Sequence, residues 1–473
     1  MIAAPLPPTP SPGEASYRAA YVWGIAFVAA LGGLLFGYDW VVISGADLFY
    51  EKYFQLVTPF DIGWAKSCAL VGCLLGAVVS GGLSDRFGRK RLLLLSALLF
   101  MGSSIGTALA DRYGVFVLWR IAGGAAIGLA SNLSPMYIAE IAPAAIRGRL
   151  VSINQLAIVV GILLAQLVNW LIAEPVPAAA TAAEILRSWN GQFGWRWMFA
   201  AAALPSLFFL AGMLLVPESP RWLAKNGQSG LARSILAKIG GDAYAARAQA
   251  EIASTLVQED ARVNFRELLS PGPRKLLLFG VALAFLQQWC GINVVFYYSK
   301  DVFAAAGYQV SDILLNIVII GLANLTFTFG AIALVDRLGR RPLMLAGWVG
   351  LAIIYVLLGG CYFAGVQGAV LVTLVVAAIA CYASTLGPVV WVVLAEIFPN
   401  RIRGAAMSIA VFALWTGCFT LTYTFPQLNS LLGPAGTFWV YAAICLGGGF
   451  FTWAKLPETK GKTLEAIERE LAQ

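Results

Sequence analysis

Long apolar stretches separated by short polar connections run through almost the whole chain. Each stretch has the roughly 20 residues that a helix needs to cross the hydrocarbon core of a bilayer. The stretches lie at 21–45, 61–83, 91–110, 113–141, 149–173, 194–216, 272–300, 311–335, 342–364, 370–397, 404–428 and 435–456. This pattern predicts an all-α polytopic membrane protein with twelve transmembrane helices.

One long polar segment, at about 219–270, interrupts the series near its middle. Apolar residues recur there at helical spacing: Leu231, Ile235, Leu236 and Ile239. The spacing predicts short amphipathic helices that lie against the ends of the transmembrane helices. A segment of this size is too short for a catalytic core of its own.

The chain also repeats itself. Asp85-Arg-Phe-Gly-Arg-Lys90 returns as Asp336-Arg-Leu-Gly-Arg-Arg341, and Pro217-Glu-Ser returns as Pro457-Glu-Thr. The segment that starts at Glu140 (Glu-Ile-Ala-Pro) returns at Glu396 as Glu-Ile-Phe-Pro. Nearly equal offsets predict two six-helix halves, and because six is even, both halves have the same orientation. The predicted units are a tail at 1–20, bundles at 21–216 and 271–456, a helical linker at 217–270 and a tail at 457–473.

Composition supports this class and excludes several others. The 473 residues are 60% hydrophobic and 12% charged, whereas a soluble domain carries about 25% charged residues. There is no histidine, which excludes His-ligated metals and Ser-His or Cys-His catalysis. The seven cysteines all fall in apolar stretches, where we interpret them as small hydrophobic filler. We therefore expect no metal, no cofactor and no enzymatic activity.

The placement of Lys and Arg predicts the orientation. If both termini lie on one side, most of the 32 basic residues lie on that side too. The opposite side has only these: Lys52, Lys66, Arg112, Arg187, Arg196 and Lys300. By the positive-inside rule, both termini are cytoplasmic. The net charge of +8 then reflects topology, and we expect no nucleic-acid partner.

Several ordered motifs narrow the class further. The duplicated loops at 85–90 and 336–341 resemble those of the major facilitator superfamily. Four further motifs are similar to those of its sugar porter family. They are Leu34-Leu-Phe-Gly-Tyr-Asp39, Pro217-Glu-Ser-Pro-Arg221, Gln287-Gln288-x-x-Gly-Ile-Asn293 and Pro457-Glu-Thr-Lys-Gly461. The resemblance covers about residues 21–468 and is greatest to the bacterial proton-coupled xylose and glucose symporters.

A pair of charged residues is the candidate for proton coupling. Asp39 lies late in the first stretch and Arg120 early in the fourth, and Arg120 is the one basic residue that we assign to the interior of a helix. Intramembrane charges are functional candidates, because burying them without a partner is costly. Both residues fall in the half of the membrane away from the termini, where they can pair. A carboxylate that alternates between an Arg partner and a proton provides coupling, although a purely structural ion pair is the alternative.

A sugar site needs paired donors and acceptors beside an aromatic face. The resemblance places Gln155, Gln287, Gln288, Asn293, Asn324 and Trp391 in contact with the sugar, and Phe36, Tyr297 and Trp415 along the cavity. The alternative for the amides is hydrogen bonding between helices. One position departs from the family, because Leu414 stands where a Gln or Asn usually contacts the sugar.

Charged residues at the cytoplasmic helix ends are candidates for an intracellular gate. They are Arg89, Glu140, Arg147 and Glu218 in the first half, and Arg340, Glu396, Arg403 and Glu458 in the second. Such pairs can hold the gate shut and break when it opens. The alternative is that these arginines serve to set the orientation of the chain in the membrane.

The sequence thus predicts a monomeric secondary transporter in the bacterial inner membrane that imports a monosaccharide, such as glucose or xylose, with a proton. Its partners are the sugar, the proton and the lipid bilayer. The alternatives are an uncoupled sugar facilitator of the same fold and, further away, a transporter-like sugar sensor.

Overall fold

The computed structural model describes residues 17–177, 180–259, 270–398 and 403–458, and these contain helices without strands. Residues 1–16 of the tail predicted at 1–20, residues 459–473 of the tail predicted at 457–473, and residues 260–269 of the predicted linker lie outside the described residues. The helices before the linker are α1 (Ala19–Val41), α2 (Ile43–Tyr53), α3 (Pro59–Phe87), α4 (Arg89–Ala108), α5 (Tyr113–Ile141), η1 (Ala144–Ile146), α6 (Arg147–Ile172), α7 (Ala182–Arg187), η2 (Asn190–Gly194), α8 (Trp195–Ala200) and α9 (Ala203–Leu215). The linker contributes α10 (Pro220–Lys225) and α11 (Ser229–Glu259). The helices after it are α13 (Pro271–Trp289), α14 (Ile292–Tyr297), α15 (Ser299–Ala305), α16 (Val310–Leu338), α17 (Arg340–Phe363), α18 (Ala369–Ser384), α19 (Leu386–Ile397) and α20 (Arg403–Lys455).

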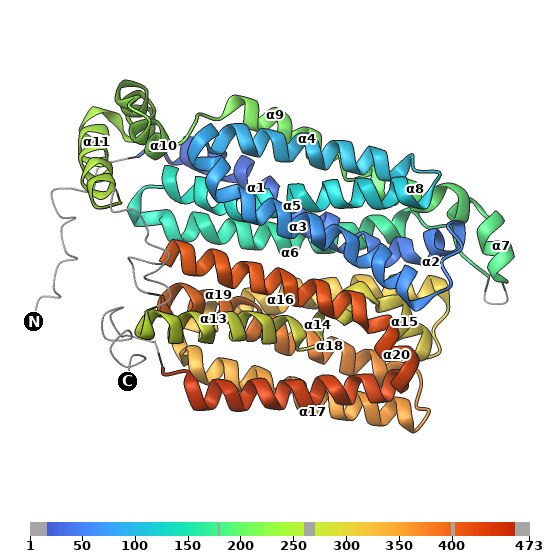
Figure 1. The fold of residues 1–473 in the computed structure, drawn as a ribbon. Helices are drawn as coiled ribbons and strands as arrows, with labels where there is room; N and C mark the ends of the chain where they lie inside the picture. The colour runs from blue at the N-terminus through green and yellow to red at the C-terminus, as the bar shows by residue number, and fades with distance from the viewer. Residues whose placement is uncertain (1–16, 178–179, 260–269, 399–402, 459–473) are drawn as a thin grey trace, which may run out of the picture.

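Eleven helical stretches of the described chain are long and apolar enough to cross a membrane. The last one, Ala405–Lys455, has 51 residues, more than twice the roughly 20 that one crossing requires. Its backbone is non-helical at Gly433 (φ 67°), directly before Pro434, and proline cannot continue a helix hydrogen-bond ladder. The α20 stretch therefore makes two antiparallel crossings (Figure 1), which gives the predicted twelve.

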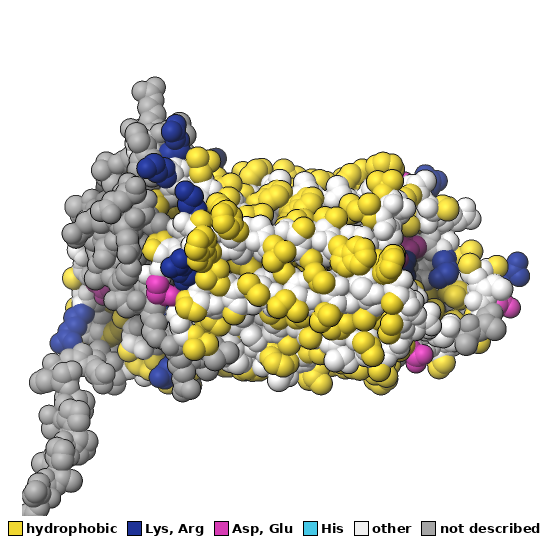
Figure 2. Space-filling model, turned by 90° about the horizontal axis from the view of Figure 1, so that it is seen from below, with side chains coloured by type: hydrophobic (Ala, Val, Ile, Leu, Met, Phe, Trp, Pro, Cys, Tyr) yellow, Lys and Arg dark blue, Asp and Glu magenta, His cyan; other side chains and the backbone are white. Residues whose placement is uncertain are grey.

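The helices form two bundles that lie side by side (Figure 1). The first contains α1 to α9 and the second α13 to α20. Figure 2 shows a wide band of hydrophobic side chains across the face in view, with charged side chains gathered towards the two ends of the molecule. Exposed Phe208, Leu215 and Phe450 belong to this apolar surface, as expected where lipid replaces water. The described chain therefore has the architecture of a multi-pass membrane protein built from two helical bundles.

The two ends of the molecule differ in what they carry. The described chain starts and stops at the same end, where α10 and α11 also lie, and we call it the terminal end (Figure 1). At the opposite end, the far end, lie the short helices α2, α7 and α15 (Figure 1).

The internal repeat is visible in the geometry of matching elements. Helices α3 and α16 both have 29 residues, and each is followed by a glycine with positive φ, at Gly88 (90°) and Gly339 (92°). The next helices, α4 and α17, begin directly after these glycines. Because only glycine adopts this backbone conformation without strain, the repeated Gly in each loop fixes the same sharp reversal in both halves.

Close packing of helices within the first bundle depends on small residues. A Cβ added at Gly72 would lie 2.0 Å from the Ile121 carbonyl oxygen, and one at Gly124 would lie 1.8 Å from the Ala69 carbonyl oxygen. The backbones of α3 and α5 therefore touch, which larger side chains would prevent.

The structure differs from the sequence prediction where two of the predicted continuous helices leave the helical backbone region. The seventh is broken at Gly291 (φ 89°) and the tenth at Thr385 (φ −132°, ψ −92°). In the linker, Leu236 and Ile239 are buried as predicted, but Leu231 is 57% exposed.

Candidate functional site

Asp39 and Arg120 form a buried ion pair between α1 and α5. Arg120 Nη1 donates to Asp39 Oδ1 at 2.6 Å, and Nη2 donates to the Asp39 backbone oxygen at 3.2 Å. The side chains are 6% and 2% exposed, respectively. The predicted pairing is therefore present, and neither charge is left alone in a medium of low polarity.

The pair is not fully satisfied. Asp39 Oδ2 and Arg120 Nε are buried without a hydrogen-bond partner among the residues that the structure describes. A Cβ added at Gly123 would lie 3.2 Å from Asp39 Oδ2, so glycine leaves the space beside this oxygen. An unpartnered buried carboxylate oxygen calls for a functional explanation, and it is a position at which a proton can be held.

Three amides lie in a row where the seventh transmembrane helix is broken. Asn293 Nδ2 donates to Gln288 Oε1 at 2.6 Å, and Gln288 Nε2 donates to Gln287 Oε1 at 2.5 Å. Gln287 and Gln288 belong to the last turn of α13, and Asn293 to the first turn of α14. The break is at Gly291, whose φ of 89° is left-handed. Irregular backbone at membrane depth is tolerated where it is buried in protein or lines a cavity, so the break brings polar groups together inside the bundle.

Aromatic rings from both halves meet next to Asp39. Trp40 lies edge-on to Tyr297 with ring centroids 5.3 Å apart, and Phe36 lies 5.8 Å from Trp415. Phe36 and Trp40 are on α1, whereas Tyr297 is on α14 and Trp415 on α20. The predicted lining residues Phe36, Tyr297 and Trp415 are thus brought together at the boundary between the bundles.

The other predicted sugar contacts belong to other helices and differ in exposure. Gln155 is exposed on α6, and Asn324 is buried on α16. Trp391, on α19, is 39% exposed. Within the described chain no hydrogen bond joins the Gln155 or Asn324 side chain to the three amides. Leu414, the departure from the family pattern, is buried directly before Trp415.

Three of the four predicted gate residues of the first half, Arg89, Glu140 and Glu218, form a cluster at the terminal end. Arg89 donates to both carboxylate oxygens of Glu140, with distances from 3.0 to 3.2 Å. Glu218 accepts the backbone N–H groups of Arg89 and Lys90 at 3.0 and 3.1 Å. The Glu218 carboxylate therefore caps the start of α4, where the free N–H groups and the helix dipole favour a negative charge.

The second half repeats this arrangement. Arg340 Nη2 lies 3.1 Å from Glu396 Oε1, and Glu458 accepts the backbone N–H groups of Arg340 and Arg341 at 3.0 and 3.1 Å. All these contacts are within one half. Arg147 is exposed at the start of α6, and the side chain of Arg403 lies outside the described residues.

Sequence reasoning missed several residues of the site. Tyr382 on α18 accepts a hydrogen bond from Gln287 Nε2 at 2.5 Å, and Trp40 completes the aromatic contact between the halves. Lys66 was assigned to the far-side connections, but it is a buried residue inside α3. Of these residues, Lys66 could have been identified from the sequence, because it lies inside an apolar stretch.

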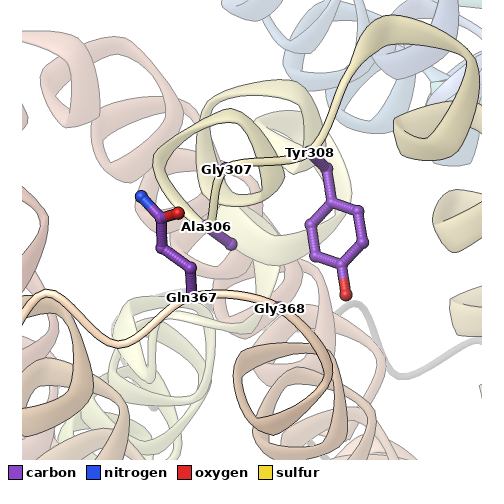
Figure 3. Close-up of a pocket in the computed structure, with 5 residues that line it drawn as sticks. All are labelled: Ala306, Gly307, Tyr308, Gln367 and Gly368. Carbon is purple, nitrogen blue, oxygen red and sulfur yellow. The ribbon is translucent and has the colours of Figure 1, made fainter.

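Two pockets of the described chain are lined by other residues than these groups. One of about 280 Å³ is lined by Ala306, Gly307, Tyr308, Gln367 and Gly368 at the far end of the second bundle (Figure 3). None of the predicted sugar-contacting residues lines it.

Comparison with known proteins places the chain among transporters. Residues 25–471 match the family described as "Sugar (and other) transporter". The chain is 41% identical to the D-xylose-proton symporter of Escherichia coli (strain K12), with 96% of each chain covered. It is 40% identical to the glucose transport protein of Synechocystis, with 97% of this chain and 100% of that protein covered. The structure matches the partially occluded inward-open conformation of the E. coli xylose transporter XylE with a TM-score of 0.82 at 38% identity, covering 94% of this chain and 100% of that chain.

Proposed function

The chain belongs to the sugar transporter family of the major facilitator superfamily and is a transporter rather than an enzyme, and from this premise we propose that it imports a monosaccharide together with a proton. The observation that carries the proposal is the buried Asp39–Arg120 pair with its unpartnered oxygen Asp39 Oδ2. It adjoins Trp40, whose ring contacts Tyr297 of the second half.

Proton coupling follows from the two charge states of Asp39. When ionised, the carboxylate holds Arg120, and α1 and α5 are tied together. When protonated, it loses most of its attraction for the guanidinium, so the energy that holds these helices in one arrangement changes. A transporter in which this change accompanies the exposure of the sugar site links the proton gradient to sugar movement.

Sugar recognition is assigned to the amides and the aromatic rings. Gln287, Gln288 and Asn293 provide donors and acceptors that match the hydroxyl groups of a neutral sugar. Phe36, Tyr297 and Trp415 provide apolar faces for its C–H groups. The assignment of Gln155, Asn324 and Trp391 rests on the family resemblance alone.

Alternating access requires the halves to rock about this central region. In the proposed orientation the terminal end is cytoplasmic, as the distribution of Lys and Arg indicates, and the membrane is the bacterial inner membrane. The Arg89–Glu140 and Arg340–Glu396 pairs would position the cytoplasmic helix ends that move apart when the site opens inward. We expect a monomer, because each chain contains both halves.

An uncoupled facilitator is the second candidate. It is favoured by the matching relative whose name, glucose transport protein, specifies no coupling, and by the fact that a buried Asp–Arg pair can be purely structural.

Transport by the purified protein in proteoliposomes decides between the two. We expect uptake of a labelled aldose to rise above equilibration when an inward proton gradient is imposed, and a panel of competing pentoses and hexoses to reveal the preferred sugar. Uptake that stops at equilibration with and without the gradient would establish the facilitator. Absence of sugar uptake under both conditions would reject sugar transport.

A further inference from the structure

Five charged side chains form a network at the far end of the molecule, separate from the Asp39–Arg120 pair. Asp47 and Glu51 come from α2, Lys66 from α3, and Lys300 and Asp301 from α15. The first three belong to the first half and the last two to the second. The network therefore crosses the boundary that must open and close during transport.

Lys66 is the centre of the network. Its Nζ atom lies 2.5 Å from Asp47 Oδ2, and it donates to the backbone oxygen of Tyr297 in the second half at 3.1 Å. It also lies 4.1 Å from the centroid of the Tyr298 ring, close enough for a cation–π attraction. The side chains of Lys66 and Asp47 are completely buried.

Glu51 connects the two lysines. Its Oε1 atom lies 3.6 Å from Lys66 Nζ, and its Oε2 atom accepts a hydrogen bond from Lys300 Nζ. Asp301 Oδ2 lies 3.7 Å from Lys66 Nζ. Lys300 lies beyond the span that ends at Tyr297. Burial alone would lower its pKa, but Asp301, Glu51 and Asp47 raise the pKa above its usual value, so the ammonium stays charged.

The degree of burial shows which contacts separate first. Side-chain exposure rises from 0% at Lys66 and Asp47 to 18% at Lys300 and 35% at Asp301. Water therefore reaches the partners from the second half, while the Lys66–Asp47 pair is shielded inside the first half. Within the described part of the chain, Glu51 Oε1 and Asp47 Oδ1 lack hydrogen-bond partners, so this network is not a fully satisfied structural core.

Further contacts close the same end. Val176 N–H donates to Ser311 Oγ at 3.2 Å, and a Cβ added at Gly63 would lie 2.5 Å from the Tyr423 carbonyl oxygen. These pairs also join the first half to the second. Opening this end would break the contacts of Lys300 and Asp301 but keep Lys66 paired with Asp47.

We propose that these five residues form the outer gate of the transporter. The Glu51–Lys300 and Lys66–Asp301 pairs hold the far end closed while the site faces the cytoplasm. When that end opens, Lys66 stays paired with Asp47 and therefore stays charged. This gate rests on the proposed alternating-access function. It assigns to Lys66, Lys300 and Glu51 the role of setting the balance between outward-open and inward-open states.

Distance measurement between spin labels tests the gate without requiring transport. Labels at Val57→Cys and Gln309→Cys report the separation of the halves, because both residues are exposed in far-end connections of opposite halves. The background lacks Cys361 and Cys381, the two native cysteines that are not buried. We expect Glu51→Gln, and likewise Lys300→Met, to raise the ratio of long to short distances about tenfold, within the range of coupling between conformational states.

The matched control is Lys225→Met, which removes a lysine from an exposed pair with Asp85 at the terminal end. This variant should leave the distance distribution unchanged. Lys300→Arg, which keeps the positive charge opposite Glu51, should change the ratio much less than Lys300→Met, a difference that a general loss of stability would not produce. If Lys300→Met does not fold, the isosteric Glu51→Gln variant carries the test.

Unchanged distances in Glu51→Gln, or an equal change in Lys300→Arg and Lys300→Met, would overturn the outer gate. Both outcomes are independent of whether a proton drives sugar uptake. A failure of accumulation in proteoliposomes would affect the proposed function and leave the distance result intact.

Discussion

Gln288 is the central residue of the amide row, since it accepts from Asn293 and donates to Gln287. Truncation to alanine should leave a sugar hydroxyl without its partner and also free the neighbouring amides. We expect Gln288→Ala to weaken sugar binding by about 1–3 kcal/mol, the penalty for an unsatisfied buried polar group. Titration calorimetry on the purified protein measures this loss. Gln309→Ala, at an exposed far-end position, is the matched control, and equal affinities of the two variants would mean that the row serves only to join helices.

Leu414 offers a gain-of-contact test at the same scale. It is buried next to Trp415, which contacts Phe36 across the halves. Leu414→Gln adds an amide where the family usually has one, so the order of preference among competing sugars should change. Leu414→Met, which keeps the volume without polar atoms, should preserve that order. A competition profile of Leu414→Gln that matches the original protein would show that position 414 does not face the sugar.

Some of the site could be predicted residue by residue, and some could not. The Asp39–Arg120 pair followed from the high cost of isolated charges in a membrane, and its contact is present. Tyr382 was missed because a tyrosine in an apolar stretch has no signal that separates a hydrogen-bonding role from packing. The gate residues were found from the repeat, but their pairing within each half depends on helix positions that motifs do not specify.

At the scale of elements, the capped starts of α4 and α17 make an internal comparison available. Glu218 and Glu458 each accept two backbone N–H groups at a helix start. We expect Glu218→Gln to destabilise the first bundle by about 1 kcal/mol, a typical loss for a helix cap, and Glu458→Gln to do the same in the second. Thermal unfolding in detergent checks both. Glu184→Gln, at the exposed start of α7, should have a smaller effect on the same transition because α7 has only six residues. An unfolding temperature unchanged in both cap variants would contradict the capping role.

Hydropathy predicted where helices cross but not where they break. A hydropathy average over a window of about 20 residues does not change when the backbone of one residue leaves the helical range of φ and ψ. Gly291 is such a residue, with a φ of 89°. The break there is stabilised by tertiary contacts such as the Asn293–Gln288 hydrogen bond. The long α20 shows the opposite case, because Gly433 and Pro434 mark its division in the sequence itself.

For the whole molecule, the central claim is that sugar movement is linked to a proton through Asp39. Coupling of this kind is a free energy that connects two binding events, so removing one event must abolish the link while the other remains. Contacts between the halves close the far end in this structure, as in one state of an alternating-access cycle. The transport function therefore depends on whether Asp39 sets the exchange between such states.

Transport by Asp39→Asn in proteoliposomes tests this claim most directly. The amide mimics the protonated carboxyl in shape and charge, so the cavity should persist while the proton response is lost. We predict that the variant exchanges labelled sugar across the membrane at a rate comparable to the original protein, yet fails to concentrate it under an imposed pH gradient that drives accumulation by the original. Accumulation by Asp39→Asn equal to that of the original protein would contradict the account.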